Sequence, residues 1–400
     1  MSRTGLGCIA GVSWSAMNHH VLCIDIDDVD QGLLAEAKTP VLDALREGGT
    51  YFSTFWAGPN CSGYRARVHS GRSAFRTENL IGTVIFGHTD SELPVGEHCL
   101  PKRLPGRSVH RGKWHLSRRA MHPIECGYAA WSGSKANLTP GSYTDWKKTS
   151  ADEHGSTTEA CTGYATTEVV EDALMDVQQG TPFVHVSMHA AHKPLHVPPR
   201  KLYHQESVPT SERGMAVAML EAADTELDRL LRTALEKDYL ILLSSDNGAA
   251  KAVGGRKRTL FENGVSTFLI AAGKGIAKGR ECAALTQAED LYATIVELRG
   301  GEHSSPDATS LVPILFDGAD SVRDTVYTEK FKPNAKAPAN DQWDQAVRGE
   351  RFKLIRARSE LISLYDLQED PAEENDLTEG ELSPEASAAM TRLLAALPKG

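Results

Sequence analysis

Two pairs of oxygen-bearing side chains, Asp27-Asp28 and Asp246-Asn247, are the first candidates for chemistry in this 400-residue sequence. Each pair follows a run of mostly apolar residues that is typical of a buried strand. In an open α/β sheet, ligands bind outside the carboxyl ends of the strands. Carboxylate and amide oxygens are the ligands that hard divalent cations such as Ca²⁺ or Mg²⁺ prefer. Either pair alone could cap a helix or lie in a solvated loop, but two pairs in one sheet favour a metal site.

Four further segments carry a thiol, ammonium groups or imidazoles, and they lie at 61–65, 112–116, 191–194 and 255–259. Each also has an ordinary structural explanation. Cys61 could be a buried thiol at a helix start, and Lys113 with His115 could lie on the solvent face of a strand. His192 could be a packing histidine, and Lys257 could belong to a basic turn. None of these segments identifies a reaction by itself.

The elements that must position these residues alternate along the chain between apolar strands and helices. The pattern predicts strands at 21–26, 51–56, 183–188, 239–244 and 268–272, and helices at 39–48, 167–178 and 211–236. Thr39 is the predicted N-cap of the first helix, Pro40 occupies its first position and Gly48 ends it. Such alternation predicts the α/β class, with a large, mainly parallel sheet sandwiched by helices.

The last part of the chain has a different pattern. Short alternating strands and a final helix are predicted at 326–328, 352–355, 363–367 and 384–397. These elements indicate a small C-terminal α+β subdomain. We therefore expect an N-terminal extension, an α/β catalytic domain and this subdomain, at 1–19, 20–317 and 318–400. The stretch 131–150, rich in Ser, Gly, Lys and Thr, is predicted to be a long surface loop.

The composition argues against several kinds of partner. There are 43 Lys and Arg residues against 53 Asp and Glu, a formal net charge of −10, so a nucleic-acid backbone is not the expected ligand. No apolar run reaches the length of about 18 residues that a membrane-spanning helix needs. The seven cysteines form no Cys-x-x-Cys pair, so neither a zinc ribbon nor a disulfide framework is expected. Residues 5–12 faintly resemble a signal peptide, but they are few and glycine-rich, so we expect a cytoplasmic protein, or a periplasmic one if they are a shortened signal.

In their order along the chain, these segments closely resemble the motifs of one family, the sulfatases of the alkaline-phosphatase superfamily. Residues 24–28 resemble its first strand with paired metal aspartates, and 39–45 resemble its Thr-Pro-x-Leu-Asp-x-Leu helix. Residues 61–72 resemble the signature Cys-x-Pro-x-Arg followed by Thr-Gly-Arg. Gly-Lys-Trp-His-Leu at 112–116 and Ser-Asp-Asn-Gly at 245–248 match the family letter for letter.

Three more motifs extend the resemblance over nearly the whole chain. They lie at 191–194, 257–264 and 364–373, and resemble Pro-His-x-Pro, Lys-Gly-Thr-Leu-Tyr-Glu-Gly-Gly and Leu-Tyr-Asp-Leu-x-x-Asp-Pro-x-Glu. The resemblance implies an alkaline-phosphatase-like fold and a metal-dependent ester hydrolase that acts on a small-molecule sulfate or phosphate ester.

The resemblance also implies roles for individual residues. Asp27, Asp28, Asp246 and Asn247 would hold one divalent cation, with Ca²⁺ expected and Mg²⁺ or Mn²⁺ as alternatives. Cys61 would be converted to formylglycine by a formylglycine-generating enzyme, and the hydrate of the aldehyde would supply the nucleophilic oxygen. Arg65 would orient that hydrate, and His115 would act as a base. The residues that would bind sulfate oxygens are Lys113, His192 and Lys257.

Aromatic residues suggest a further substrate contact. The segment 126–163 carries Trp131, Tyr143 and Trp146, and we predict that it borders the substrate, with Trp146 as a binding residue. The alternative is a surface loop that packs its aromatic side chains into a small cluster of its own.

The sequence departs from the family's motifs at positions that affect function. Gly63 and Tyr64 stand where the signature has proline and a small residue, and Ala191 replaces the proline of Pro-His-x-Pro. Residues 266–268 replace the family's Arg-Val-Pro. Because the maturation enzymes read the Cys-x-Pro-x-Arg stretch, Gly63 could prevent the conversion of Cys61. An unmodified thiolate is also a nucleophile, but it lacks the easy route for releasing sulfate.

Three functions therefore stay open. The first is hydrolysis of aryl or small organic sulfates. The second is hydrolysis of phosphodiesters, phosphonate monoesters or phosphotriesters, which related enzymes carry out at the same kind of metal site. The third is a degenerate member that binds an anion without turnover. The presence of every ligand and cation of the motifs, namely Lys113, His115, Asp246, Asn247 and Lys257, counts against this third function.

Overall fold

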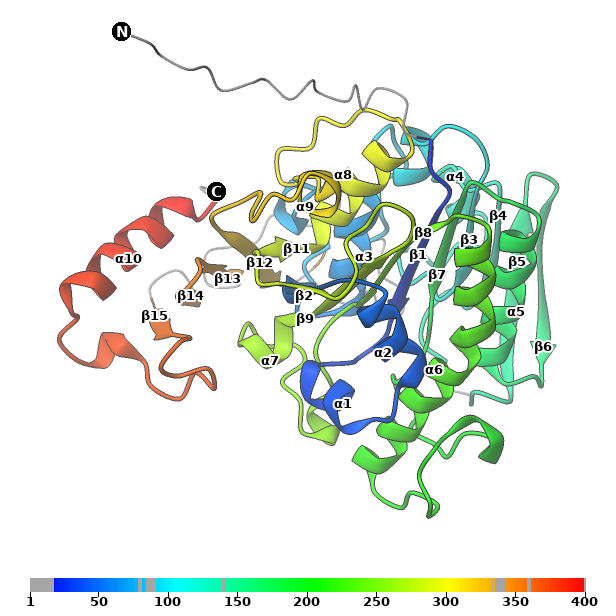
Figure 1. Ribbon diagram of the computed structural model, residues 1–400, viewed down its shortest axis with the longest axis horizontal. Helices are drawn as coiled ribbons and strands as arrows, with labels where there is room; N and C mark the ends of the chain where they lie inside the picture. The colour runs from blue at the N-terminus through cyan, green and yellow to red at the C-terminus, as the bar shows by residue number, and fades with distance from the viewer. Residues whose placement is uncertain are drawn as a thin grey trace, which may run out of the picture.

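The computed structural model describes residues 18–77, 81–83, 91–138, 142–332, 334, 343–357 and 361–398. Within these residues, eleven strands form one central sheet (Figure 1). Its path runs through β10 (Arg280–Cys282), β2 (Gly49–Trp56), β9 (Ser266–Ala272), β8 (Leu240–Ser245), β1 (Val21–Ile26), β7 (Phe183–Ser187), β3 (Ser108–Gly112), β4 (Ala130–Gly133), β5 (Trp146–Asp152) and β6 (Gly155–Cys161), and β11 (Thr286–Gln287) pairs with β2.

The middle of this sheet is parallel, as predicted. Strands β8, β1, β7, β3 and β4 all pair in parallel, while β9 runs antiparallel to both β8 and β2. All six residues of β1 and of β8 are buried, because helices cover both faces of the sheet. The parallel centre brings the carboxyl ends of β1, β8, β7 and β3 to the same edge.

Helices cover the two faces of the sheet in two separate apolar layers (Figure 1). The first layer contains residues of α2 (Pro40–Glu47), α5 (Ala165–Gln178) and α6 (Glu212–Glu236), with α1 (Gln31–Glu36) beside them. The second layer contains residues of α3 (Cys61–Ser70), α8 (Ala288–Leu298) and α9 (Val312–Phe316), and α4 (His122–Glu125) packs at its edge. None of the described helices is both long and apolar enough to cross a membrane.

Helix α2 begins at the predicted place but is capped differently from the prediction. Thr39 precedes the helix and Pro40 is its first residue, yet the Thr39 side chain makes no capping hydrogen bond. The carboxylate of Asp224, on α6, instead accepts hydrogen bonds from the backbone N–H groups of Val41 and Leu42, at 3.1 and 2.8 Å. A cap supplied by another helix, more than 180 residues away, cannot be read from the local sequence.

The C-terminal part forms a small antiparallel sheet with a helix, as predicted. Strands β12 (Val326–Phe331), β13 (Trp343–Arg348), β14 (Phe352–Ala357) and β15 (Leu361–Asp366) pair in sequence order, and α10 (Pro384–Ala396) packs on them. A short helix, α7 (Glu262–Val265), joins the central sheet to this region. The boundaries of the expected domains stay a prediction. The expected N-terminal extension lies outside the described residues except for Asn18 and His19.

The prediction of a surface loop over 131–150 is wrong for most of its described residues. Trp131 lies buried on β4, and Trp146 begins a hairpin of β5 and β6 that extends the edge of the sheet. Most residues of β6 are exposed, because it is an edge strand with no strand beyond it among the described residues. Strand β5 has one buried and one exposed face, so polar residues alternate along it, which is why its composition resembled that of a loop.

Candidate active site

The two predicted metal-ligand pairs meet at the edge of the sheet because β1 and β8 are parallel neighbours, with Ile26 opposite Ser245. The backbone N–H of Asp28 donates to Asp246 Oδ1 at 3.1 Å. Asn247 Nδ2 donates to Asp28 Oδ1 at 2.8 Å. Asp27, Asp28, Asp246 and Asn247 are all buried, so four oxygen-bearing side chains lie together away from water.

Cys61 is the first residue of α3, and its thiol lies against these carboxylates. Its Sγ is 3.3 Å from Asp27 Oδ1. Burial, with the nearby carboxylates of Asp246 and Asp27, raises the pKa of the Cys61 thiol. The helix is capped by Asn60, whose Oδ1 accepts a hydrogen bond from the backbone N–H of Gly63 at 2.9 Å. A proline at position 63, as in the family signature, would have no N–H for this cap.

Two lysines place their ammonium groups on this cluster. Lys113 directly follows β3, and its Nζ contacts the Asp27 carboxylate. Lys257 Nζ contacts Asp28 and lies 3.1 Å from Cys61 Sγ. Burial opposes ionisation of Asp27, but Lys113 and the neighbouring cations outweigh it and hold the pKa of Asp27 well below its ordinary value. Burial likewise opposes the charge on Lys257, yet Asp28 and its neighbours raise the pKa of that ammonium well above its ordinary value.

Arg65 lies one helical turn beyond Cys61 on α3 and is fully enclosed. Its guanidinium lies 3.0 Å from Asp25 Oδ2 and 3.7 Å from Asp246 Oδ2, and it donates to the Lys113 carbonyl at 2.9 Å. Asp25 was not predicted to belong to the site. Its position within the apolar strand Val21–Ile26 was the available signal, because a carboxylate inside a buried strand needs a partner.

The two predicted histidines also reach the cluster. His192 Nε2 is 3.9 Å from Asp28 Oδ2, and its Nδ1 lies 2.8 Å from the Lys193 carbonyl. Burial lowers the pKa of His192 to about 4, although Asp28 opposes this. The pKa of His115 is also lowered well below its ordinary value, by burial and by the charge of Lys113, and its buried Nδ1 has no hydrogen-bond partner. Both imidazoles are therefore neutral bases at neutral pH.

The turn that carries His192 is held by Tyr143, which the sequence placed near the substrate. Its hydroxyl donates toward the carbonyls of His189 and His192, at 2.6 and 2.7 Å. Trp146 does not reach the cluster: its indole is buried and donates to the Gly163 carbonyl at 3.1 Å. Its ring packs beside that of His189, with centroids 6.1 Å apart, so Trp146 lies in the core and the structure gives no support to its predicted contact with substrate.

The residues at this edge fit a divalent cation. Ligand atoms of Asp27, Asp28, Asp246 and Cys61 all lie within 4.8 Å of one another. Asp246 Oδ2 and Asn247 Oδ1 are buried and accept no hydrogen bond. Unpartnered buried acceptors are costly, and a hard cation would satisfy both.

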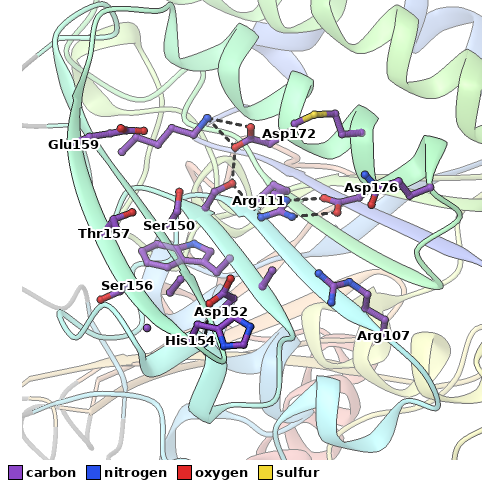
Figure 2. A pocket seen from close by; sticks show the side chains of 18 residues that line it. Arg107, Arg111, Ser150, Asp152, His154, Ser156, Thr157, Glu159, Asp172 and Asp176 are labelled. Carbon is purple, nitrogen blue, oxygen red and sulfur yellow. Dashed lines mark hydrogen bonds and ion pairs between the residues drawn. The ribbon is translucent and has the colours of Figure 1, made fainter.

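Of two cavities near the sheet, one opens onto this cluster and the other does not. One of about 360 Å³ opens beside Asp28 and is lined by Ala191, Lys193, Leu195, Glu212, Met215, Ala250, Ala252 and Val253. The other, of about 610 Å³, lies between the β5–β6 hairpin and α5 (Figure 2). In it Arg111 pairs with Asp176, and Ser132 and Lys148 pair with Asp172, so these groups are engaged with one another. None of the predicted site residues lines the second cavity.

Comparison with known proteins identifies the family. The sulfatase family model matches residues 24–301, and the model described as "N-sulphoglucosamine sulphohydrolase, C-terminal" matches 256–399. The chain therefore belongs to the sulfatase family, whose members are sulfuric ester hydrolases, and this confirms the predicted family and class of enzyme.

Individual relatives agree with this assignment. N-acetylgalactosamine-6-sulfatase of Sus scrofa is 28% identical over 379 residues, which cover 82% of this chain and 71% of that protein. Choline-sulfatase of Rhizobium meliloti (strain 1021) is 31% identical over 171 residues, covering 41% of this chain and 32% of that protein.

Solved structures show the same fold. Ps i-CgsB, determined in complex with k-i-k-neocarrahexaose, superposes with a TM-score of 0.78 at 20% identity, covering 94% of this chain and 91% of the other. The phosphonate monoester hydrolase SpPMH from Silicibacter pomeroyi gives a TM-score of 0.71 at 17% identity, with 94% of each chain covered. The predicted alkaline-phosphatase-like fold is thereby confirmed.

Proposed function

We propose that this protein hydrolyses sulfate esters of small organic or aryl alcohols, with the attacking oxygen supplied by residue 61. The observation that carries this proposal is the position of Cys61, at the start of α3, 3.1 Å from the Lys257 ammonium and 3.3 Å from the Asp27 carboxylate. A nucleophile at this place has cations beside it to bind the anionic ester, and neutral imidazoles within the same cluster to accept or return a proton.

The side chains have separate tasks in this proposal. Lys113 and Lys257 bind the sulfate oxygens and stabilise the charge that develops on them. Arg65 orients residue 61, and neutral His115 accepts a proton from it. His192, on the side of the cluster next to the Asp28 cavity, returns a proton to the departing alcohol oxygen.

Two additions to the chain are part of the proposal. Asp27, Asp28, Asp246 and Asn247 would hold a divalent cation, Ca²⁺ being our choice because all four offer hard oxygens, and such a cation polarises the ester and favours an ionised nucleophile. Conversion of Cys61 to formylglycine, by an enzyme that reads residues 61–65, would supply a hydrate oxygen as nucleophile. The raised pKa of the unmodified thiol supports this conversion over a cysteine thiolate.

The cavity beside Asp28 supports a small leaving group. Its volume of about 360 Å³ lies at the lower end of ordinary ligand sites, and most of its lining is aliphatic. The charged residues of the lining are Asp28, which is buried, and Lys193 and Glu212, which are exposed. A single aryl or sugar ring would fit better than an oligosaccharide.

Mass spectrometry of the tryptic peptide 47–65 is the first test, after expression with a formylglycine-generating enzyme. Formylglycine at position 61, with turnover of an aryl sulfate that exceeds turnover of the matched aryl phosphodiester, is the expected result. Unmodified Cys61 with turnover of the phosphodiester would favour the second function, hydrolysis of phosphate or phosphonate esters. This alternative is retained because Gly63 replaces the proline of the maturation signature. Sulfate binding without turnover of either ester would indicate a binding protein.

A further inference from the structure

Three histidines lie in the second apolar layer, directly beneath the candidate active site. His69 is on α3, His110 on β3 and His185 on β7, and each is at most 1% exposed. His110 and His185 are paired residues on adjacent parallel strands. The rings of His69 and His185 stack with centroids 4.9 Å apart. The rings of Trp114, Tyr128 and Phe183 pack against them within this layer, so three imidazoles here need a reason.

Two of these histidines belong to a closed ring of polar contacts, an ion pair and four nitrogen–oxygen contacts of hydrogen-bond length, that begins and ends at Arg65. The Arg65 guanidinium is paired with Asp25 Oδ2 at 3.0 Å, and the other oxygen of Asp25 is 2.7 Å from His185 Nε2. His185 Nδ1 is 3.1 Å from the Tyr128 hydroxyl, which is also 3.1 Å from His69 Nε2. His69 Nδ1 returns to the Arg65 backbone carbonyl at 2.8 Å.

The chemistry of the partners sets the direction of the bonds. A backbone carbonyl only accepts, so His69 Nδ1 carries a hydrogen and its Nε2 accepts from Tyr128. The Asp25 carboxylate also accepts, so His185 donates to it through Nε2. Each histidine thus has one nitrogen fixed by an acceptor and the other 3.1 Å from the Tyr128 hydroxyl. Because that hydroxyl gives its single proton to His69, it can bond to His185 Nδ1 only as an acceptor, when that nitrogen also carries a hydrogen. His110 is not a member of this ring: its Nε2 lies 3.2 Å from the Ser187 hydroxyl, which also hydrogen-bonds to Asp25, so His110 reaches that carboxylate only through Ser187.

The ring constrains Arg65 from both its ends. The side chain is held through Asp25, and the backbone of the same residue is held through His69. Since Arg65 is one turn after Cys61, a fixed guanidinium keeps a fixed relation to the helix start that carries residue 61. Apolar side chains at these positions would fill the layer without the desolvation cost of burying imidazoles. Packing alone therefore does not account for them.

We propose that His185, acting through Asp25, is a positioning residue that holds the Arg65 guanidinium for catalysis, with Tyr128 and His69 completing its support. This inference rests on the proposed function insofar as it concerns turnover. It requires that His185 act as a hydrogen-bond donor to Asp25, and that its contribution to packing be separable from that role.

The test compares His185→Gln with His185→Leu in the full-length protein carrying its maturation. The amide of Gln can place an N–H near the position of the imidazole Nε2, whereas Leu fills the apolar layer but donates nothing. We expect His185→Gln to keep kcat close to the wild-type value, and His185→Leu to lower kcat on the order of 10- to 100-fold with little change in KM. His185→Leu also leaves one oxygen of the buried Asp25 carboxylate without its donor and should lower the thermal midpoint more than His185→Gln, so kcat is compared at a temperature at which both variants are folded.

His110→Leu is the matched control, because His110 lies in the same layer, pairs with His185 in the sheet and is not part of the ring. It should leave kcat near the wild-type value. Equal kcat values for the Gln and Leu variants of His185, or the same loss of kcat in His110→Leu, would overturn the proposal. A third result would also overturn the proposal: one equivalent of zinc in the purified wild-type protein, lost in both His185→Leu and His110→Leu. The imidazoles would then be metal ligands.

Crystal structures of the two His185 variants give a readout that needs no turnover. Arg65 should keep its contacts with Asp25 and the Lys113 carbonyl in His185→Gln, and should lose at least one of them in His185→Leu. Unchanged Arg65 contacts in both would overturn the proposal. If the mature wild-type enzyme turns over no ester, the proposed function fails, and these two structures still decide whether His185 positions Arg65.

Discussion

The candidate active site and the contact between the two sheets both bury carboxylates with cations, yet they pair them differently. The second cluster, here called the clamp, consists of Glu262, Arg348, Lys353 and Glu373. Lys353 Nζ lies 3.1 Å from Glu262 and 2.7 Å from Glu373, and Arg348 pairs with Glu262 at 2.5 Å. Two carboxylates therefore meet two cations.

At the active site the charges are not matched in this way. Four carboxylates (Asp25, Asp27, Asp28 and Asp246) face three permanent cations (Arg65, Lys113 and Lys257). Three buried acceptor oxygens of the site lack a hydrogen-bond partner, on Asp25, Asp246 and Asn247, against one in the clamp, on Glu373, which instead forms an ion pair with Lys353. The pKa values do not separate the clusters, since each holds one carboxyl of either kind: cations outweigh burial and lower the pKa of Glu262 and of Asp27, whereas burial raises the pKa of Glu373 and of Asp246.

The comparison separates a structural contact from a binding site within one molecule. A buried cluster whose charges are all matched holds two parts of the chain together. A buried cluster with unmatched acceptors is arranged for a further cation. The clamp also joins the Lys257-to-Gly264 motif to the motif that ends at Glu373, which explains why both occur in one protein.

The largest expected effect follows from removal of Cys61, the proposed nucleophile of the active site. Cys61→Ala should lower turnover by about 10³-fold or more, since no attacking group remains at the start of α3. Steady-state kinetics on an aryl sulfate measures it. Cys23→Ala, which removes another buried cysteine, is the control and should retain activity. Similar losses in both variants would mean that Cys61 contributes through packing.

Metal binding should distinguish the two clusters directly. At a free Ca²⁺ concentration 100 times its Kd, the ion should stabilise the fold by about 2.7 kcal/mol, and a chelator should remove this together with activity. Asp246→Asn should lose the stabilisation, whereas Lys353→Met should keep it. Thermal unfolding with Ca²⁺ and with chelator tests this. A wild-type protein that responds to neither would show that the unmatched acceptors do not bind the ion.

Disruption of the clamp should affect stability more than chemistry. Lys353→Met leaves Glu262 and Glu373 buried without their shared cation, and we expect a loss of about 3–5 kcal/mol in the free energy of unfolding. Lys330→Met is the control, because its pair with Asp344 is partly exposed and should contribute about 1 kcal/mol or less. Denaturant unfolding compares them, and equal effects would contradict the role of the clamp.

Asp224 provides a third arrangement, a buried carboxylate that meets helix N–H groups and no cation. Burial raises its pKa from 3.8 to about 7, against the effect of those hydrogen bonds. The folded state therefore binds the proton more tightly than the unfolded state, so stability should fall as pH rises from 3.8 to about 7. A tenfold difference in proton affinity between the two states corresponds to about 1.4 kcal/mol of stability.

Denaturant unfolding across this pH range tests the expectation. Asp224→Asn should lose stability from its weaker cap but should show a flatter pH dependence than the wild type. Glu236→Gln, which removes an exposed carboxylate at the far end of α6, should leave the slope unchanged. Parallel curves for the wild type and Asp224→Asn would contradict the assignment.

The smallest expected effect concerns the unusual glycine of the signature. Gly63→Pro removes the N–H that Asn60 accepts, but proline is tolerated in the first turn of a helix. We expect a loss of about 1 kcal/mol and a larger fraction of formylglycine at position 61. Gly63→Ala keeps the N–H and is the control. If mass spectrometry finds the same conversion in all three proteins, Gly63 does not limit maturation.

Much of the site could be predicted from the sequence because its residues occupy recognisable motifs at strand and helix ends. Asp27, Asp28 and Asp246 follow buried strands, and Lys113 follows β3, so a parallel sheet brings them together. The prediction was wrong where polar composition was taken to indicate a loop, over β4 and the part of β5 up to residue 150. It was also not supported for Trp146, because an aromatic residue in an unassigned segment can equally well be part of the core.

By itself, the sequence determined five strands of the central sheet, three of the helices that cover it and, through its motifs, the family, since these depend on local periodicity and on residue types at fixed spacing. Only the tertiary structure decided which partner each buried polar group has. Asp224 caps a helix far away in the chain, Lys353 pairs with carboxylates from two motifs, and Asp25 meets both Arg65 and His185. The physical reason is that a buried charge is stabilised by whichever group the fold places within a few ångströms, and that distance is set by packing rather than by separation along the chain.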